Sequence, residues 1–139
     1  MNVLIAEDHA ITAKLIANTI SQMNDFDVVG LAANGQEVVK AVDDKLIDVI
    51  LMDINMPYLD GLQATEKVLQ KSPNIKILVI SGYSEPWIIK KSLNVGALGF
   101  INKKEGLDKL GNAISTVFNG FPYLDDTSLQ SIVKDYSFS

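Results

Sequence analysis

The sequence alternates five times between a short apolar run and a longer segment of helical periodicity. In each longer segment the apolar residues recur every three or four positions, which is the spacing of one buried helix face. Strands that alternate with helices form βαβ units, and these build a parallel sheet with helices on both faces. We therefore expect an α/β fold with a doubly wound, five-stranded parallel sheet. The apolar runs that predict its strands lie near residues 3–6, 28–32, 49–52, 75–80 and 97–101.

The length of the chain, 139 residues, suits a single domain with a short appendage. We place the main domain at residues 1–121 and the appendage at residues 122–139. In the appendage, acidic residues that can start a helix precede four apolar residues at positions i, i+3, i+4 and i+7. The four are Leu129, Ile132, Val133 and Tyr136. One short amphipathic helix is too small for a DNA-binding domain, so we interpret it as the start of a linker to an absent output domain.

The charge of the chain argues against a nucleic-acid interface on these residues. The formal net charge is −5, and all twelve bases are lysines because arginine does not occur. Phosphate binding needs clustered positive charge, which two isolated Lys pairs do not supply. Cysteine is absent, which excludes disulfides and thiolate ligands, and there is no secretion signal or apolar run that could span a bilayer. We expect a cytoplasmic protein with no membrane partner.

Polar side chains follow four of the five predicted strands. Glu7 and Asp8 come after the first strand, and Asp53 closes the third. Ser81 ends the fourth strand, and Lys103 follows the fifth. The carboxyl ends of parallel strands meet at one edge of a sheet, where ligands bind close to the switch in strand order. We therefore expect these five side chains to form one site.

The residue types at this edge favour phosphoryl chemistry. Three neighbouring carboxylates repel one another unless a cation lies among them. Few oxygen ligands, with room for water and phosphate, suit Mg²⁺ better than Ca²⁺, and the lack of cysteine with a single histidine, His9, argues against zinc. We expect Asp53 to attack a phosphoryl group, Lys103 to neutralise its oxygens and Ser81 to donate a hydrogen bond to one of them. His9 is expected beside the site as an ordinary polar residue.

Each of these residues also has an ordinary structural interpretation. Glu7 and Asp8 can cap the first helix, where acidic side chains are favoured. Ser81 can be a turn hydroxyl and Lys103 a surface lysine, and a lone Asp53 at a strand end is more often a turn or capping residue. Their joint placement at one sheet edge is what favours a reaction centre.

Further landmarks accompany the candidate site. Met56-Pro57 and Asp60-Gly61 follow Asp53, and Phe100 lies three residues before Lys103. With the acidic pair and the serine, these landmarks resemble the receiver domain of a bacterial two-component response regulator over residues 2 to about 120. The resemblance implies a flavodoxin-like (βα)5 fold. It also implies that Asp53 becomes an aspartyl phosphate, formed from the phosphohistidine of a sensor histidine kinase.

The same resemblance implies the ligands of a magnesium ion. Asp8 and Asp53 would bind Mg²⁺ by their side chains, Glu7 through a water molecule and Asn55 through its backbone carbonyl. A receiver catalyses only its own Mg²⁺-dependent phosphorylation and dephosphorylation. We therefore do not expect an enzyme that acts on a separate substrate.

Two stretches indicate the subgroup of this family. Ala97–Lys104 and Gly120–Leu124 resemble the NarL/LuxR-type regulators, in which a helix-turn-helix domain follows the receiver. Lys104 stands where many receivers have proline, and regulators of this subgroup commonly lack that proline. The resemblance implies a switch in which Ser81 moves toward the phosphoryl group and Phe100 changes rotamer. It also implies transcription regulation, with DNA contacted only through the helix-turn-helix domain.

A homodimer that forms on phosphorylation is a further expectation. The first and fifth helices carry enough apolar residues for a dimer surface, although the same residues are compatible with a core. Ile11, Leu15, Ile16, Ile20 and Met23 are expected to form one apolar face on the first helix.

Three other functions remain open from the sequence. A stand-alone receiver would act by protein docking or by passing the phosphoryl group onward, without DNA. A phosphatase of the haloacid dehalogenase type would need a second acid two residues after its nucleophile, where this chain has Asn55. An FMN carrier of the flavodoxin type would need a phosphate-binding Ser/Thr/Gly loop, which the strand ends lack.

Overall fold

The structure, a computed structural model, describes residues 1–137. Its strands are β1 (Asn2–Ala6), β2 (Asp27–Ala32), β3 (Val49–Asp53), β4 (Lys76–Ser81), β5 (Gly99–Asn102) and β6 (Tyr123–Leu124). Its α-helices are α1 (Ala10–Ser21), α2 (Gly35–Asp44), α3 (Gly61–Lys71), α4 (Pro86–Asn94), α5 (Leu110–Phe118) and α6 (Asp126–Ser137), with 3₁₀ turns at Lys103–Glu105 and Leu107–Lys109. Within the described residues, none of these helices has both the length and the apolar character needed to cross a bilayer.

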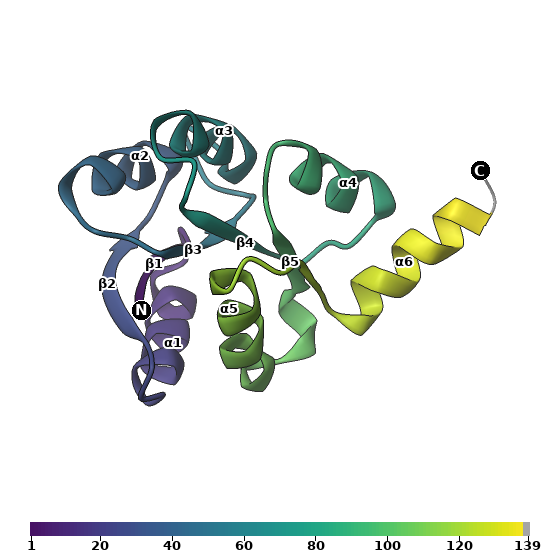
Figure 1. Cartoon of the computed structure of the whole chain (residues 1–139), viewed down its shortest axis with the longest axis horizontal. Helices are drawn as coiled ribbons and strands as arrows, with labels where there is room; N and C mark the ends of the chain where they lie inside the picture. The colour runs from purple at the N-terminus through teal and green to yellow at the C-terminus, as the bar shows by residue number, and fades with distance from the viewer. Residues whose placement is uncertain (138–139) are drawn as a thin grey trace.

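The sheet is parallel and lies between two layers of helices. Helices α2, α3 and α4 cover one face, and α1 and α5 cover the other (Figure 1). β3 shows why: its residues are all buried, with Ile50 and Met52 in the core beneath α2 to α4, and Val49 and Leu51 in the core beneath α1 and α5. A strand buried on both faces reads as a continuous apolar run, as the sequence suggested. The predicted α/β architecture is confirmed.

The strand order fixes where a ligand would bind. The order is β2-β1-β3-β4-β5-β6, and every neighbouring pair is parallel. The chain passes from β1 to β2 on one side and then returns to place β3 on the other side of β1. The switch point therefore lies between the carboxyl ends of β1 and β3, which is where open parallel sheets bind ligands.

The prediction of five strands is wrong by one short strand. β6 pairs with β5 through two residues, so that Tyr123 lies opposite Gly99 and Leu124 opposite Phe100. Two residues are too few to show a periodic pattern, and β6 follows Pro122 directly. The predicted helix in the C-terminal appendage is confirmed as α6.

The buried face of α1 differs from the predicted one. Ala13, Ile16 and Ile20 are buried, but Ile11 is 85% exposed and Leu15 is 56% exposed. Ile11 precedes Ala13 by two residues, which is about 200° around a helix. The expectation that all five apolar residues share one face is therefore wrong, and two large apolar side chains of α1 lie in solvent.

Candidate functional site

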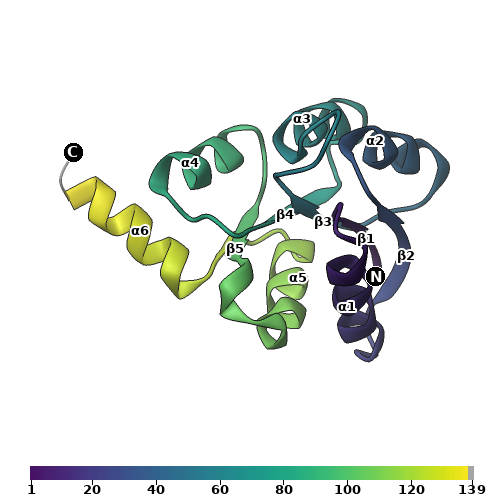
Figure 2. The same cartoon turned by 180° about the vertical axis from the view of Figure 1, so that it is seen from behind.

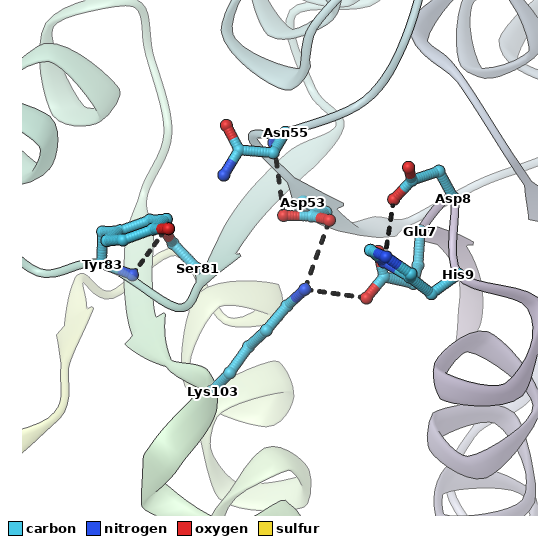
Figure 3. A network of polar contacts seen from close by, with 8 residues as sticks. All are labelled: Glu7, Asp8, His9, Asp53, Asn55, Ser81, Tyr83 and Lys103. Atoms are coloured by element: carbon cyan, nitrogen blue, oxygen red, sulfur yellow. Dashed lines mark hydrogen bonds and ion pairs between the residues drawn. The ribbon is translucent and has the colours of Figure 1, made fainter.

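The expected site residues come together at the carboxyl edge of the sheet (Figure 3). Asp53 is the last residue of β3 and Ser81 the last of β4. Glu7 directly follows β1, and Lys103 directly follows β5. Because Glu7 and Asp53 end the strands on either side of the switch point, the two carboxylates lie where the sheet topology opens a crevice.

Lys103 joins the two buried carboxylates. Its Nζ donates to Glu7 Oε1 at 2.8 Å and to Asp53 Oδ2 at 3.3 Å. The side chains of Glu7 and Asp53 are 1% and 3% exposed, whereas that of Lys103 is 29% exposed. The partly exposed ammonium of Lys103 thus binds two buried carboxylates.

This arrangement shifts the pKa values of both acids. Burial raises the pKa of Asp53 to about 7, with a further rise from the neighbouring Glu7, while Lys103 opposes the shift. Burial also opposes ionisation of Glu7, but hydrogen bonds with Asp53 and Lys103 outweigh it and lower the pKa of Glu7 to about 2. For Lys103, burial favours the neutral amine, yet Glu7 and Asp53 raise its pKa above the usual value. At pH values between these two pKa values, Glu7 is ionised and Asp53 is protonated, so the two acids hold one proton between them.

The acidic end of the site fits a divalent cation. Glu7 Oε2 is buried and has no hydrogen-bond partner among the described residues. A buried carboxylate oxygen without a donor is energetically costly, and a cation would satisfy it. Asp8 extends the acidic surface next to it, with ligand atoms of Glu7, Asp8 and His9 all within 4.8 Å of one another.

One expected metal ligand, Asp53, lies outside this group. Asp53 is not among the residues whose ligand atoms cluster within 4.8 Å, since its Oδ2 faces Lys103 and its Oδ1 accepts a hydrogen bond from the backbone N–H of Asn55 at 3.3 Å. His9 lies beside the site as expected, with its Nδ1 at 3.2 Å from Asp8 Oδ1.

Ser81 and Phe100 are both buried in the sheet. Ser81 Oγ accepts a hydrogen bond from the backbone N–H of Tyr83 at 3.1 Å. Since the hydroxyl acts as acceptor in that bond, its own proton is not used there. Phe100 is fully buried in the core beneath α2 to α4, where it lies between Val79 of β4 and Leu124 of β6 in register.

Gly61 holds the loop after Asp53 close to the sheet. Its N–H donates to Ile54 O at 2.9 Å, and Asp60 caps α3 through a capping box with Gln63. A Cβ on Gly61 would lie 2.1 Å from the backbone oxygen of Asp53. The glycine is thus required by a close approach of two backbone segments. The described glycines with positive φ are Gly96, Gly106 and Gly120.

The fold and this site together define a class of protein. A flavodoxin-like parallel sheet that places an acidic pair, a buried Asp, a Ser hydroxyl and a Lys at its switch point has the architecture of a signal-receiver domain. The comparison with family models agrees, because the response regulator receiver domain family matches residues 3–115. The chain belongs to this family.

The similar proteins indicate the subgroup. The chain is 30% identical to the transcriptional regulatory protein DegU of Brevibacillus brevis over 98% of its own length and 58% of the relative. Among solved structures, a LuxR-family two-component response regulator from Aurantimonas has a TM-score of 0.94 at 22% identity, covering 98% of this chain and 97% of that one, which shows the shared fold. The receiver domain of the response regulator NarL from Mycobacterium tuberculosis has a TM-score of 0.80 at 28% identity, covering 86% and 96%.

These relatives are response regulators of the NarL/LuxR type. The chain spans about three fifths of the length of the curated relatives that it matches.

Proposed function

We propose that this receiver domain accepts a phosphoryl group on Asp53 from the phosphohistidine of a sensor histidine kinase. The observation that carries the proposal is the buried Asp53 carboxylate at the switch point, bonded to the ammonium of Lys103. Burial and the neighbouring Glu7 both disfavour ionisation of Asp53, so a carboxylate at this position calls for a functional explanation. Phosphoryl acceptance supplies that explanation.

The reaction is a phosphoryl transfer between two nucleophiles. Ionised Asp53 attacks phosphorus with one carboxylate oxygen, and the bond from phosphorus to the kinase histidine breaks as the new bond forms. The histidine nitrogen keeps the electron pair of the broken bond and is reprotonated from solvent. Lys103 neutralises charge on the phosphoryl oxygens, and Ser81 has a hydroxyl proton to donate to one of them.

The bound cofactor in this proposal is Mg²⁺. Asp8 and Asp53 would hold it by their carboxylates, Glu7 through water and Asn55 through its backbone carbonyl. When bound, the ion supplies positive charge for the phosphoryl oxygens. Glu7 Oε2, which is buried and has no hydrogen-bond donor among the described residues, supports a cation at this end of the site. The domain is not expected to turn over a separate substrate beyond its own phosphorylation and dephosphorylation.

The proposed readout uses Ser81 and Phe100. Ser81 would turn from Tyr83 toward the phosphoryl group, and Phe100 would change rotamer in response. Phe100 belongs to a packed core, so its movement requires a shift of neighbouring residues.

The proposed output is transcription regulation in the cytoplasm. The similarity to DegU, a transcriptional regulatory protein, supports it, and DNA would be contacted through a helix-turn-helix domain that these residues do not include. Phosphorylation would also favour a homodimer. The exposed Ile11 and Leu15 on α1 support this part of the proposal, because a dimer would bury them.

The experiment that tests this function is phosphorylation by a small donor. Incubation with acetyl phosphate and Mg²⁺ should add one phosphoryl group to the purified chain, detected by intact mass spectrometry, and chelation of Mg²⁺ should prevent it. Asp53→Ala should abolish the modification, whereas Asp43→Ala, at an exposed surface acid, should retain it. Equal modification of the Asp53→Ala chain would rule out Asp53 as the acceptor.

A further inference from the structure

The C-terminal segment, residues 123–137, lies at the β5 edge of the sheet. Within it β6 pairs with β5, and α6 lies beside α4 (Figure 2). Lys90 of α4 forms an ion pair with Asp135 of α6. Ile132 of α6 packs against the core beneath α2 to α4, the core that also contains Phe100.

One group of contacts ties this segment to the loop that carries Ser81. Ser131 Oγ of α6 donates to the backbone oxygen of Ser84 at 2.8 Å. Ser84 lies three residues after Ser81, in the same loop as Tyr83, whose N–H holds Ser81 Oγ. A movement of Ser81 toward Asp53 would therefore pull on a loop that α6 holds in place.

A second group of contacts ties the segment to Lys103. The preceding residue, Asn102, is buried, and its backbone N–H donates to Asp125 Oδ2. The Asn102 side chain donates to Ser84 Oγ at 3.0 Å and accepts from the N–H of Lys104 at 2.9 Å. Asn102 thus connects Lys103, the loop after Ser81 and the C-terminal segment.

Asp125 transmits this connection into α6. It is 2% exposed, and its second oxygen, Oδ1, accepts from the N–H of Ser128 at 2.7 Å, which caps the first turn of α6. One buried carboxylate therefore satisfies the end of β5 and the start of α6 at once. A shift of Asn102 leaves a buried oxygen of Asp125 without its hydrogen-bond donor, which is costly.

We propose that the C-terminal segment is the element through which phosphorylation of Asp53 is first reported, by loosening of α6 from the α4–β5 edge. The inference rests on the proposed function and names its regulation. Lys103 Nζ lies 3.3 Å from Asp53 Oδ2, so a phosphoryl group on that carboxylate displaces the ammonium from its present place. Ser81 must turn to donate to the same group. Lys103 and the loop after Ser81 therefore both move, and both are connected through Asn102 to the buried Asp125.

Coupling of this kind is reciprocal. If phosphorylation weakens the anchoring of α6, then weakening the anchor stabilises the phosphorylated chain relative to the unphosphorylated chain by the same free energy. The variant Ser131→Ala removes the hydroxyl that holds Ser84 and leaves the site residues unchanged. Gln130→Ala, at the exposed neighbouring position on α6, is the matched control.

The test is amide hydrogen exchange of α6 in the full chain, with and without acetyl phosphate and Mg²⁺. Phosphorylation should speed exchange in residues 126–137 by about fivefold or more, and leave β1 and β3 protected. In Ser131→Ala, exchange in α6 should already be faster before phosphorylation, and phosphorylation should speed it by a smaller factor than in Gln130→Ala. If Ser131 has a purely structural role, phosphorylation should speed exchange by the same factor in both variants.

The outcomes separate the inference from the function on which it rests. Full phosphorylation with unchanged α6 exchange would overturn the inference and leave the proposed function standing. An equal effect of phosphorylation on α6 exchange in Ser131→Ala and Gln130→Ala would also overturn it. Failure of the wild-type chain to take up a phosphoryl group would overturn the proposed function, and the inference with it.

Discussion

Asp53 combines two properties that normally oppose each other, burial and a role that requires charge. A protonated carboxyl is a poor nucleophile, and burial raises the pKa of Asp53 to about 7. Cation binding at the neighbouring Glu7 and Asp8 would favour the ionised form, because opposite charge stabilises a carboxylate. The residue would thus be most reactive when the acidic end of the site is filled, which links phosphorylation to the metal.

The raised pKa of Asp53 predicts how stability depends on pH without added metal. Between the ordinary pKa near 3.8 and the folded value near 7, the unfolded chain ionises first, so ionisation of Asp53 lowers stability as the pH rises. Asp53→Asn cannot ionise and should gain stability relative to the wild type over this window, by roughly 2 kcal/mol at pH 8 and little at pH 4. Urea denaturation in EDTA measures it. A constant difference between the two chains at all pH values would contradict the shift.

Lys103 is the cation of the buried cluster, so removal of its charge should lower stability. Lys103→Met leaves Glu7 and Asp53 without their partner and should destabilise the fold by about 2 kcal/mol at pH 8, and less at pH 5 where Asp53 is protonated. The matched control is Lys71→Met, which breaks the exposed pair with Asp43 and should change stability by less than about 0.5 kcal/mol. Chemical denaturation of both variants at the two pH values decides this. Equal losses of stability in both variants would show that the buried cluster contributes no more to stability than the exposed ion pair.

The loop between β3 and α3 holds Asp53 in position. A Cβ at Gly61 would overlap the backbone oxygen of Asp53, whereas a Cβ at Gly82 meets no atom within 4 Å. Gly61→Ala should therefore destabilise the domain by about 2 kcal/mol, because the β3–α3 loop must move. Gly82→Ala should change stability by less than about 0.5 kcal/mol. Thermal unfolding compares the two, and a tolerated Gly61→Ala would mean that the loop is free to relax.

Most elements of the fold could be predicted because periodicity reports burial directly. β3 is apolar up to Asp53 because both its faces are covered, and the four apolar positions of α6 follow a helical period. β6 is not predictable in this way because two residues carry no period. Apolar spacing alone does not say which stripe of a helix meets the sheet, so it places Ile11 on the wrong face of α1.

The site could be predicted in part for a similar reason. Asp53, Ser81 and Lys103 all mark strand ends, and parallel strands bring their ends together. The roles of Asn102 and Asp125 were not predictable, because their contact joins residues 23 positions apart in sequence and depends on the pairing of β5 with β6. Strand order is likewise a property of tertiary packing.

The charge of the whole molecule bears on its partners. With a formal charge of −5 and no arginine, the domain should repel the phosphate backbone of DNA. Fluorescence anisotropy with a labelled duplex should give a Kd weaker than about 100 μM at physiological salt. Binding tighter than about 10 μM that weakens as salt is added would contradict the view that DNA is contacted only through another domain.

The identity of the phosphorylated atom tests the central proposal most directly. After treatment with acetyl phosphate and Mg²⁺, borohydride reduces an aspartyl phosphate to homoserine, and peptide mass spectrometry locates the changed residue. Reduction should be found at Asp53 and at neither Glu7 nor Asp8, and Asp53→Ala should show none. Reduction at another acid of the cluster, or persistent phosphorylation of the Asp53→Ala chain, would contradict the assignment of Asp53 as the phosphoryl acceptor.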